Sequence, residues 1–236
     1  MTVYLSSLQH VFLLTGIVDM CERWQNECST FFSVAKGVRQ GGILSPFLFR
    51  FYIRDLIFSI TSMNVGCKLC GINVNLLAYA DDLVLLAPSW VALQRLLDAA
   101  EAAASKINMT FNTRKTVCMV FNPASRSKRV ADSFPVFTLC NSQLVFVDQF
   151  KYLGHIIDNS FSGDSDINME VKALFVRTNL LCRRFKRRSK LVKVRLFRSL
   201  CVCFYDTALW CNYSVGAISR LASCYNKCLK YFFWIF

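Results

Sequence analysis

The sequence predicts an α+β fold in which a mixed strand-and-helix part is followed by a part made of helices alone. Between residues 30 and 157, apolar residues recur at every second position in some segments and at helical spacing in others. After residue 165 the apolar patterns have helical spacing. The stretch Asp158–Ser165, rich in Ser, Gly, Asn and Asp, separates the two parts. We therefore predict one domain at residues 1–157 and a second at 158–236.

The first elements are predicted from short apolar patterns. Leu5–Leu14 is predicted to be a helix, and Thr30–Val34 a short strand that runs into a glycine turn. Pro46–Ile60 is predicted to be a strongly apolar helix, because Ser45-Pro46 is a favourable start and large apolar residues follow at helical spacing. These residues are Phe47, Leu48, Phe51, Tyr52, Leu56 and Ile60.

A hairpin with a polar tip is predicted next. Ile72–Leu76 alternates as a half-buried strand, and Leu83–Ala87 is a continuous apolar strand. The polar tip between them is Tyr79–Asp82. Residues 88–89, Pro-Ser, are then expected to start a helix with one apolar face. That face consists of Leu93, Leu96, Leu97, Ala100, Ala104 and Ile107.

Four strands and a loop complete the mixed part. The loop, Pro123–Ser133, is polar and basic, so it is expected at the surface. The predicted strands are Val117–Phe121, Val136–Leu139, Leu144–Val147 and Tyr152–Ile157.

The charge balance predicts a polyanionic partner. The formal net charge is +13, which favours nucleic acid first and an anionic membrane surface second. A basic protein with no specific polyanion is the alternative. No apolar run reaches the roughly 18 residues of a membrane span, and no signal peptide is expected at residues 1–18. We expect an intracellular protein, nuclear or cytoplasmic, that does not act in a membrane.

Twelve cysteines favour reduced thiols that pack as small hydrophobic groups. Disulfide scaffolds are short and secreted, and this chain is neither. The best zinc spacing is Cys67-x-x-Cys70, but no second pair follows at knuckle distance, and His10 and His155 are isolated. Structural zinc is therefore the less favoured interpretation.

Adjacent carboxylates at the hairpin tip indicate a divalent cation site. Asp81 and Asp82 repel each other unless their charge is compensated. Mg²⁺ takes hard oxygen ligands and is often held by one or two carboxylates together with substrate phosphates. The alternative is an ordinary Asp-Asp turn in water, since aspartate favours turns.

The glycine turn before the apolar helix indicates phosphate or nucleotide binding. Gly41 and Gly42 allow the backbone to approach a ligand closely, and backbone N–H groups near a helix start favour phosphate. Arg39 adds a positive charge, and Gln40 can both donate and accept hydrogen bonds. A plain turn and helix start is the alternative.

Four segments in order along the chain resemble conserved motifs of reverse transcriptases. Gly37–Pro46 resembles the second motif, and Tyr79–Asp82 resembles the third in its YADD form. Asn112–Thr116, which contains Lys115, looks like the fourth, and Phe150–Gly154 looks like the fifth, the primer grip. Order and spacing agree throughout. The chain is most similar to reverse transcriptases of non-LTR (LINE-like) retrotransposons, with group II intron maturases as second relatives.

The resemblance implies a partial right-hand polymerase, with an antiparallel palm sheet backed by helices and then a helical thumb. It implies RNA-directed DNA synthesis, in which dNTPs are added to a DNA primer on an RNA template. Two Mg²⁺ ions would be used, with Asp81 as the principal ligand and Asp82 as its neighbour. The residues implied to contact the nucleotide and template are Arg39, Gln40, Gly41, Gly42, Tyr79 and Lys115. Those implied to hold the primer are Phe150, Tyr152, Leu153 and Gly154.

Two of these implied roles have open alternatives. Lys115 could be a solvated surface lysine, and Phe150 and Tyr152 could serve ordinary strand packing.

A basic helical segment follows the mixed part. Lys172–Arg198 holds eleven cations, and no acid lies between Glu170 and Asp206. The segment looks like a thumb that grips the nucleic-acid backbone through phosphates. A solvated basic face, a nuclear-localisation run and a membrane-surface helix are the alternatives. The residues expected on the phosphates are Arg183, Arg184, Lys186, Arg187 and Arg188.

The family's first motif, which supplies a further metal-binding aspartate, is not found before the glycine turn. The one aspartate there is Asp19, which lies close to the turn and outside an apolar strand. We expect the N-terminal polymerase segment to be missing from this chain, and the chain alone not to polymerise. The alternative function is a catalytically inactive nucleic-acid-binding remnant of a retrotransposon.

Overall fold

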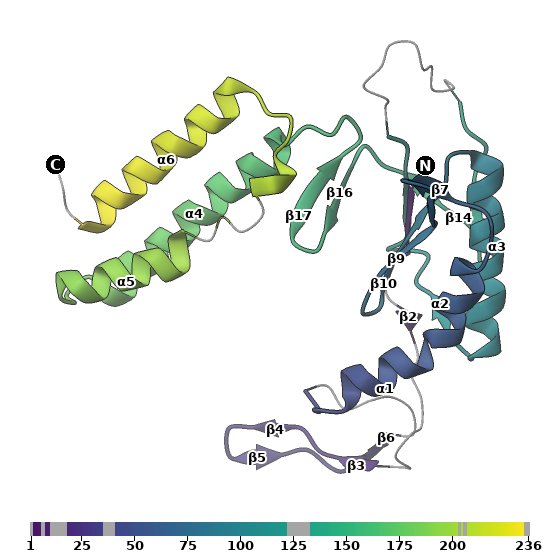
Figure 1. Cartoon of the computed structure of the whole chain (residues 1–236). Helices are drawn as coiled ribbons and strands as arrows, with labels where there is room; N and C mark the ends of the chain where they lie inside the picture. Colours follow the sequence, from purple (N-terminus) through teal and green to yellow (C-terminus); the bar gives the residue numbers. More distant parts are fainter. Residues whose placement is uncertain are drawn as a thin grey trace. The chain divides into compact units, whose positions relative to one another are not determined.

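The chain forms two compact units. The computed structural model describes residues 2–5, 8–9, 18–34, 41–121, 133–202, 204 and 207–233. Residues 1–120 and 130–147 form one unit, here the sheet unit, and residues 121–129 and 148–236 form the other, here the helical unit. Figure 1 shows strands and helices in the first and mainly helices in the second. The predicted mixed α+β class is therefore confirmed.

A five-stranded sheet is the centre of the sheet unit. Its middle strand β1 (Thr2–Leu5) pairs with β10 (Asp82–Leu86) on one side and with β12 (Val117–Met119) on the other. Strand β9 (Leu76–Tyr79) flanks β10, and β15 (Val145–Phe146) flanks β12. The pairs are antiparallel except β12 with β15, which are parallel.

The predicted helix at Leu5–Leu14 is wrong where the structure describes it. Leu5 ends β1, and β2 (Leu8–Gln9) pairs with β11 (Thr110–Phe111). A strand between two partners gains ladder hydrogen bonds along both edges, and this tertiary pairing outweighs a short helical pattern. Residues 10–14 lie outside the described part of the chain.

The predicted helix at Pro46–Ile60 is two helices in the structure. α1 (Ser45–Tyr52) ends at Ile53, and α2 (Arg54–Thr61) follows with a new direction. Of the two, only α2 has fully buried side chains, Leu56 and Ile60, whereas α1 packs the half-buried Phe49 and Tyr52 against the core. The largest exposed apolar side chains of α1 are Phe47 and Phe51. Helical spacing thus identified the right residues for helix but not the break between them.

The predicted strand Ile72–Leu76 is also divided. β8 (Ile72–Val74) pairs with β7 (Cys67–Leu69), whereas β9 belongs to the main sheet. Asn75 separates them and is buried, with its Nδ2 donating to the Ile60 carbonyl at 2.8 Å. A buried amide satisfied by a helix end fixes this change of partner.

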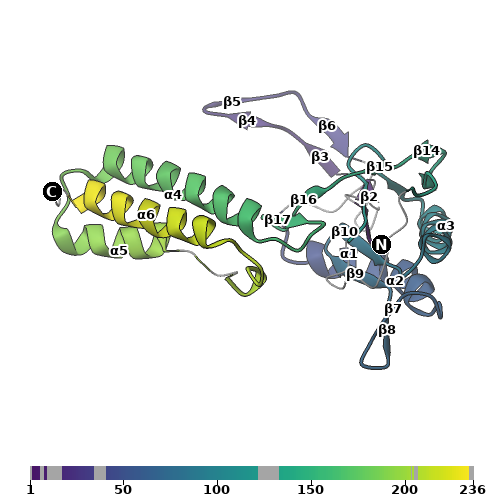
Figure 2. The same ribbon diagram turned by 90° about the horizontal axis from the view of Figure 1, so that it is seen from above.

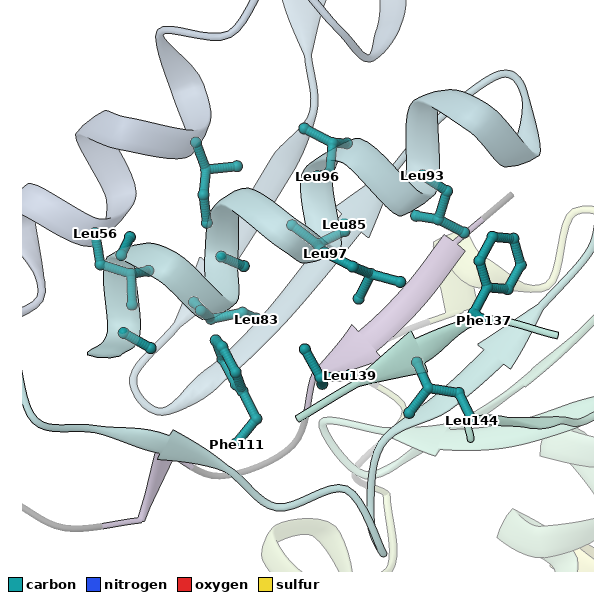
Figure 3. Close-up of a cluster of buried hydrophobic side chains, with 14 of the residues drawn as sticks. Leu56, Leu83, Leu85, Leu93, Leu96, Leu97, Phe111, Phe137, Leu139 and Leu144 are labelled. Carbon is teal, nitrogen blue, oxygen red and sulfur yellow. The ribbon is translucent and has the colours of Figure 1, made fainter. Parts of the chain in front are cut away.

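The core lies between the sheet and the helices α2 and α3 (Trp90–Lys106). Ser89 caps α3 as predicted, with its hydroxyl accepting from the Ala92 N–H at 3.3 Å. Figure 3 shows leucines of α3 beside Leu83 and Leu85 of β10. Apart from the half-buried Ile107, the predicted apolar face of α3 is fully buried. Each such leucine contributes about 1.5–3 kcal/mol through burial.

Short hairpins complete the strands of both units. The predicted strand Tyr152–Ile157 is two strands, β16 (Gln149–Tyr152) and β17 (His155–Asp158), joined by a tight turn at Leu153-Gly154. The predicted strand at Thr30–Val34 is confirmed as β6 (Phe32–Val34). The other short strands are β3 (Val18–Met20), β4 (Arg23–Trp24), β5 (Glu27–Cys28), β13 (Thr138–Leu139) and β14 (Ser142–Gln143).

Three helices make up the body of the helical unit, as the sequence predicted for the end of the chain. α4 (Asp164–Phe185) and α6 (Val215–Phe233) lie side by side and run in the same direction, and α5 (Lys190–Cys201) runs back in the opposite direction beside them (Figures 1 and 2). A short 3-10 helix, Thr207–Leu209, precedes α6. Their shared core holds Leu174, Leu181, Phe197, Cys201, Cys224, Cys228 and Phe232.

The compact units divide before the β16–β17 hairpin, so the hairpin belongs with the helices. The predicted boundary at residue 158 follows the hairpin. The cysteines described by the structure form no disulfides, and four of them are buried, which agrees with the thiol interpretation. Within the described ranges, no helix is both long and apolar enough to span a membrane.

Candidate functional site at the sheet edge

The hairpin tip presents both aspartates to solvent. Tyr79 pairs with Asp82, which leaves Ala80 and Asp81 as the two turn residues. Asp81 is exposed and Asp82 is half-buried, whereas the next residue, Leu83, is fully buried. Successive strand residues point to opposite faces, so Leu83 and Leu85 face the helices and Asp82 faces away from them. The core therefore anchors the tip while its carboxylates stay accessible.

The tip has an unusual backbone. Ala80 has a φ of +52°, in the left-handed region that costs a residue with a Cβ about 1–2 kcal/mol. Paired strands on both sides of the turn hold it there. Two-residue hairpin turns require a positive φ, so the pairing of β9 with β10 imposes this strain and fixes where the two aspartates lie.

Lys115 lies at the same edge of the sheet as the aspartates. β10 and β12 both pair antiparallel with β1 and so run parallel to each other, both starting at this edge. Asp82 starts β10, and the turn containing Lys115 precedes β12. With one strand between them, their backbones are roughly 10 Å apart. Lys115 is exposed, and Thr116 holds its turn through hydrogen bonds to the Asn112 carbonyl.

The strand beside the aspartates carries no acid. β1 pairs with β10 and consists of Thr-Val-Tyr-Leu. Asp19 lies instead on β3, which pairs with β6, and its carboxylate accepts from Ser33 Oγ at 2.5 Å. Across the ranges that the structure covers, no three His, Cys, Asp or Glu side chains gather as a metal site. Asp81 and Asp82 thus fit a divalent cation in ligand type but supply few ligands.

The glycine turn is described only in part. Gly41 has a φ of +79° and no atom within 4 Å of the place a Cβ would occupy, so it needs to be glycine for its backbone conformation. Gly42 follows it, and α1 begins three residues later, with Pro46 in its first turn. Arg39 and Gln40 lie outside the described residues.

The segment predicted as a primer grip forms a tight hairpin. Leu153 (φ +47°) and Gly154 (φ +96°) are both left-handed, as a two-residue turn that matches strand twist requires. Phe150 and Tyr152 are half-buried on β16, and Lys151 is exposed between them. These exposures are compatible with primer contact and with strand packing alike.

A buried carboxylate connects this hairpin to α4. Asp166 is 4% exposed. Its oxygens accept from Ile156 N at 2.8 Å and Trp210 Nε1 at 2.8 Å, and one lies 3.1 Å from His155 Nδ1. Burial opposes ionisation, but these hydrogen bonds outweigh it and hold the pKa of Asp166 below its ordinary value.

Asp166 and Trp210 were not singled out from the sequence. The acids in the first turn of a helix were the available signal for Asp166. Nothing in the sequence pointed to Trp210.

The excess of positive over negative charge is confined to the end of the chain. Residues 1–170 contain 14 cations and 14 acids, whereas residues 171–236 contain 14 cations and a single acid, Asp206. The five cations predicted to bind phosphate lie at the end of α4 and in the turn before α5, and all are exposed. The net charge of +13 thus resides in residues 171–236, which lie in the helical unit, a partition that counting along the sequence would have revealed.

Comparisons with known proteins agree with the motifs. The family described as reverse transcriptase (RNA-dependent DNA polymerase) matches residues 4–157. The chain is 34% identical over 131 residues to the Pol polyprotein of the type-1 retrotransposable element R2 of Nasonia vitripennis, covering 54% of this chain and 13% of that protein. It is 36% identical over 126 residues to the R2DM polyprotein of Drosophila melanogaster, covering 52% of this chain and 12% of that one.

A relative from another mobile element is similar over a stretch of nearly the same length. The RNA-directed DNA polymerase from mobile element jockey of Drosophila funebris is 31% identical over 135 residues, covering 55% of this chain and 14% of that protein. The chain therefore spans only a small part of the length of these relatives.

Proposed function

This chain belongs to the reverse transcriptase family, and from that membership we propose that its hairpin tip is the metal-binding part of an RNA-directed DNA polymerase site. The observation that carries the proposal is the solvent-facing pair Asp81 and Asp82 on a strained turn that the core holds in place. The site would add nucleotides from dNTPs to a DNA primer paired with an RNA template.

Asp81 and Asp82 would hold Mg²⁺ through their carboxylate oxygens. Bound Mg²⁺ would activate the primer's 3′-oxygen and stabilise the leaving pyrophosphate. Lys115, at the same sheet edge, would lie near the triphosphate, where its positive charge offsets phosphate charge. Tyr79 would pack near the primer end, since it is 61% exposed beside the aspartates.

The other predicted contacts extend this site. The Gly41-Gly42 backbone would line the incoming nucleotide, which suits the open space around Gly41. Arg39 and Gln40, just before it in the chain, would contact the nucleotide and the templating base. The hairpin residues Phe150, Tyr152, Leu153 and Gly154 would hold the primer.

The two units would act as palm and thumb. The sheet unit would be the palm, and the helical unit would grip the primer–template backbone through its exposed cations. This division assigns the β16–β17 hairpin to the palm by function, although it packs with the helices. We expect the protein to act inside the cell, in the nucleus or cytoplasm, where template RNA is found.

The metal site is proposed to be incomplete in this chain. β1 offers no carboxylate beside Asp82, and a two-metal site needs further ligands. The purified chain is therefore expected not to extend a primed RNA template with Mg²⁺ and dNTPs. If the purified chain does extend the primer and Asp81→Asn abolishes that extension, the metal site is not incomplete, but the polymerase assignment is supported.

A chimera tests the polymerase assignment directly. The preceding polymerase segment of the Nasonia vitripennis R2 relative, joined to this chain, is expected to give Mg²⁺-dependent extension. Asp81→Asn should abolish it, whereas Asp98→Asn, an exposed carboxylate on α3, should not. A folded chimera that binds primer–template but shows no extension, or extension insensitive to Asp81→Asn, would count against the proposal.

A second candidate is a non-catalytic nucleic-acid-binding remnant. The confinement of the net charge to residues 171–236 favours it, since such a surface can bind nucleic acid without chemistry. Binding by a chimera that cannot extend a primer would support this function. If the chimera does not bind primer–template even at low salt, both the polymerase and the nucleic-acid-binding remnant are excluded.

A further inference from the structure

A cavity at one end of the helical unit is separate from the proposed polymerase site. Its volume is about 400 Å³, within the range of roughly 300–1,000 Å³ of small-ligand sites. It lies where α4 and α6, which run side by side, both end (Figures 1 and 2). Its lining residues are Asn179, Cys182, Arg183, Lys186, Tyr231 and Phe232.

The wall of this cavity is positively charged. Arg183 is exposed and forms no ion pair with a carboxylate in the described part of the chain. No acid lies on α5 or α6, and none lies on α4 after Glu170. Burial raises the pKa of the Cys182 thiol, so that thiol adds no negative charge at neutral pH. An anion entering the cavity would meet the Arg183 guanidinium and no competing carboxylate from these helices.

Helix ends attract cations by themselves, which could account for some of this charge. At the end of α6, however, Lys193 already fills that role. Its Nζ lies 3.5 Å from the Phe232 carbonyl oxygen and 5.5 Å from the centre of the Phe232 ring. Arg183 is therefore not needed at the end of α6. It lies in the last turn of α4, where Arg184 is also available to compensate the helix end, and its exposed guanidinium can bind an external anion.

An exposed aromatic ring stands beside these cations. Tyr231 is 61% exposed, whereas its neighbour Phe232 is 1% exposed and packs in the helical core. Exposed Asn179 offers an amide that can both donate and accept hydrogen bonds. Aromatic faces next to cations are the combination that binds single-stranded nucleic acid, because every base has a face that can stack.

We propose that this cavity binds one unpaired nucleotide of a single-stranded nucleic acid, with the phosphate on Arg183 and the base stacked on Tyr231. The inference rests on the proposed function, which brings nucleic acid to the helical unit. Bases inside a duplex stack on each other and cannot reach Tyr231. The site therefore distinguishes a single strand from a duplex, unlike the exposed cations around it.

The test compares two labelled probes, an oligouridylate and a blunt-ended duplex, by fluorescence anisotropy with the full chain. Tyr231→Ala is expected to weaken oligouridylate binding about tenfold and to leave duplex binding unchanged. Tyr231→Phe, which keeps the ring, should bind like the unmodified chain. Tyr213→Ala removes a similarly exposed tyrosine (51%) away from the cavity and should change neither probe.

Charge variants test the phosphate contact separately. Arg183→Gln should weaken oligouridylate more than duplex. Arg184→Gln removes the same charge from an exposed neighbour outside the cavity and should weaken both probes alike. Circular dichroism melts check that each variant is folded, which the high exposure of Tyr231 favours.

Three results would overturn the inference. If Tyr231→Ala binds oligouridylate as tightly as the unmodified chain, the cavity proposal fails while the proposed function stands. Equal losses on both probes would mean that Tyr231 serves the fold or general binding. If the unmodified chain binds neither probe but binds a phosphorylated peptide through Arg183, both the cavity proposal and the nucleic-acid role of this unit are wrong.

Discussion

Ala80 adopts a backbone conformation that lowers the stability of the folded chain. Its φ of +52° places a Cβ where glycine is preferred. Ala80→Gly is expected to raise the free energy of unfolding of the sheet unit by about 0.5–1 kcal/mol, because relief of strain exceeds the added freedom of the unfolded chain. Chemical denaturation followed by circular dichroism measures the change.

A control for this prediction lies in the same hairpin. Ala78 sits in β9 with ordinary strand geometry. Ala78→Gly should therefore lower stability by about 0.5–1 kcal/mol. Equal destabilisation by both substitutions would contradict the interpretation of Ala80 as strained.

Asp166 is the residue whose charge has the clearest structural consequence. Its pKa is depressed in the folded chain, so its stabilising contribution is present above the unfolded pKa of about 3.9 and is lost as pH falls through the folded value. Asp166→Asn is expected to lower the stability of the helical unit at neutral pH by about 1–3 kcal/mol. It should also reduce the loss of stability between roughly pH 5 and 2.

Trp210→Phe separates the hydrogen bond from the packing. It removes the Nε1–H that donates to Asp166 but keeps an aromatic ring. Thermal melts at several pH values should place this variant between the unmodified chain and Asp166→Asn. A pH dependence identical in all three proteins would show that Asp166 does not contribute to acid stability.

At the scale of elements, the end of α4 and the following turn form a concentrated phosphate-binding surface in the proposed function. The double variant Arg187→Gln with Arg188→Gln is expected to weaken duplex binding. It should also make the negative slope of log affinity against log salt less steep by about 2, one for each lost phosphate contact. Titrations at several salt concentrations give the slope.

The matched control removes two charges from the charge-balanced part of the chain. Lys68 and Arg95 are both exposed, on β7 and α3. Lys68→Gln with Arg95→Gln should leave the slope nearly unchanged. If both double variants lower it equally, net charge rather than this surface governs binding.

For the whole molecule, the two units have separate cores. Leu97 belongs to the core of the sheet unit and Leu181 to that of the helical unit, and both are buried. Leu97→Ala and Leu181→Ala should each cost about 2–5 kcal/mol within its own unit. Calorimetry is expected to resolve two transitions, each lowered by only one of the substitutions. A single transition that both variants shift would show that the units unfold together.

The family and the identity of most elements followed from the sequence alone. Tyr79–Asp82 between apolar strands, the glycine turn and the apolar face of α3 are local patterns, and the forces behind them act over a few residues. The run of basic residues near the end of the chain is also a pattern within one stretch of sequence. These features did not depend on the arrangement of distant segments, so the sequence was sufficient to find them.

Only the tertiary structure decided where strands divide and which elements meet. The strand assignment of Leu5, the change of partner at Asn75 and the contact of Asp166 with Trp210 each depend on residues far away in sequence. The shared edge of Asp82 and Lys115 likewise depends on β1 pairing with both β10 and β12. Hydrogen bonds and burial between distant segments outweigh local preference, and no pattern within one segment records its partner.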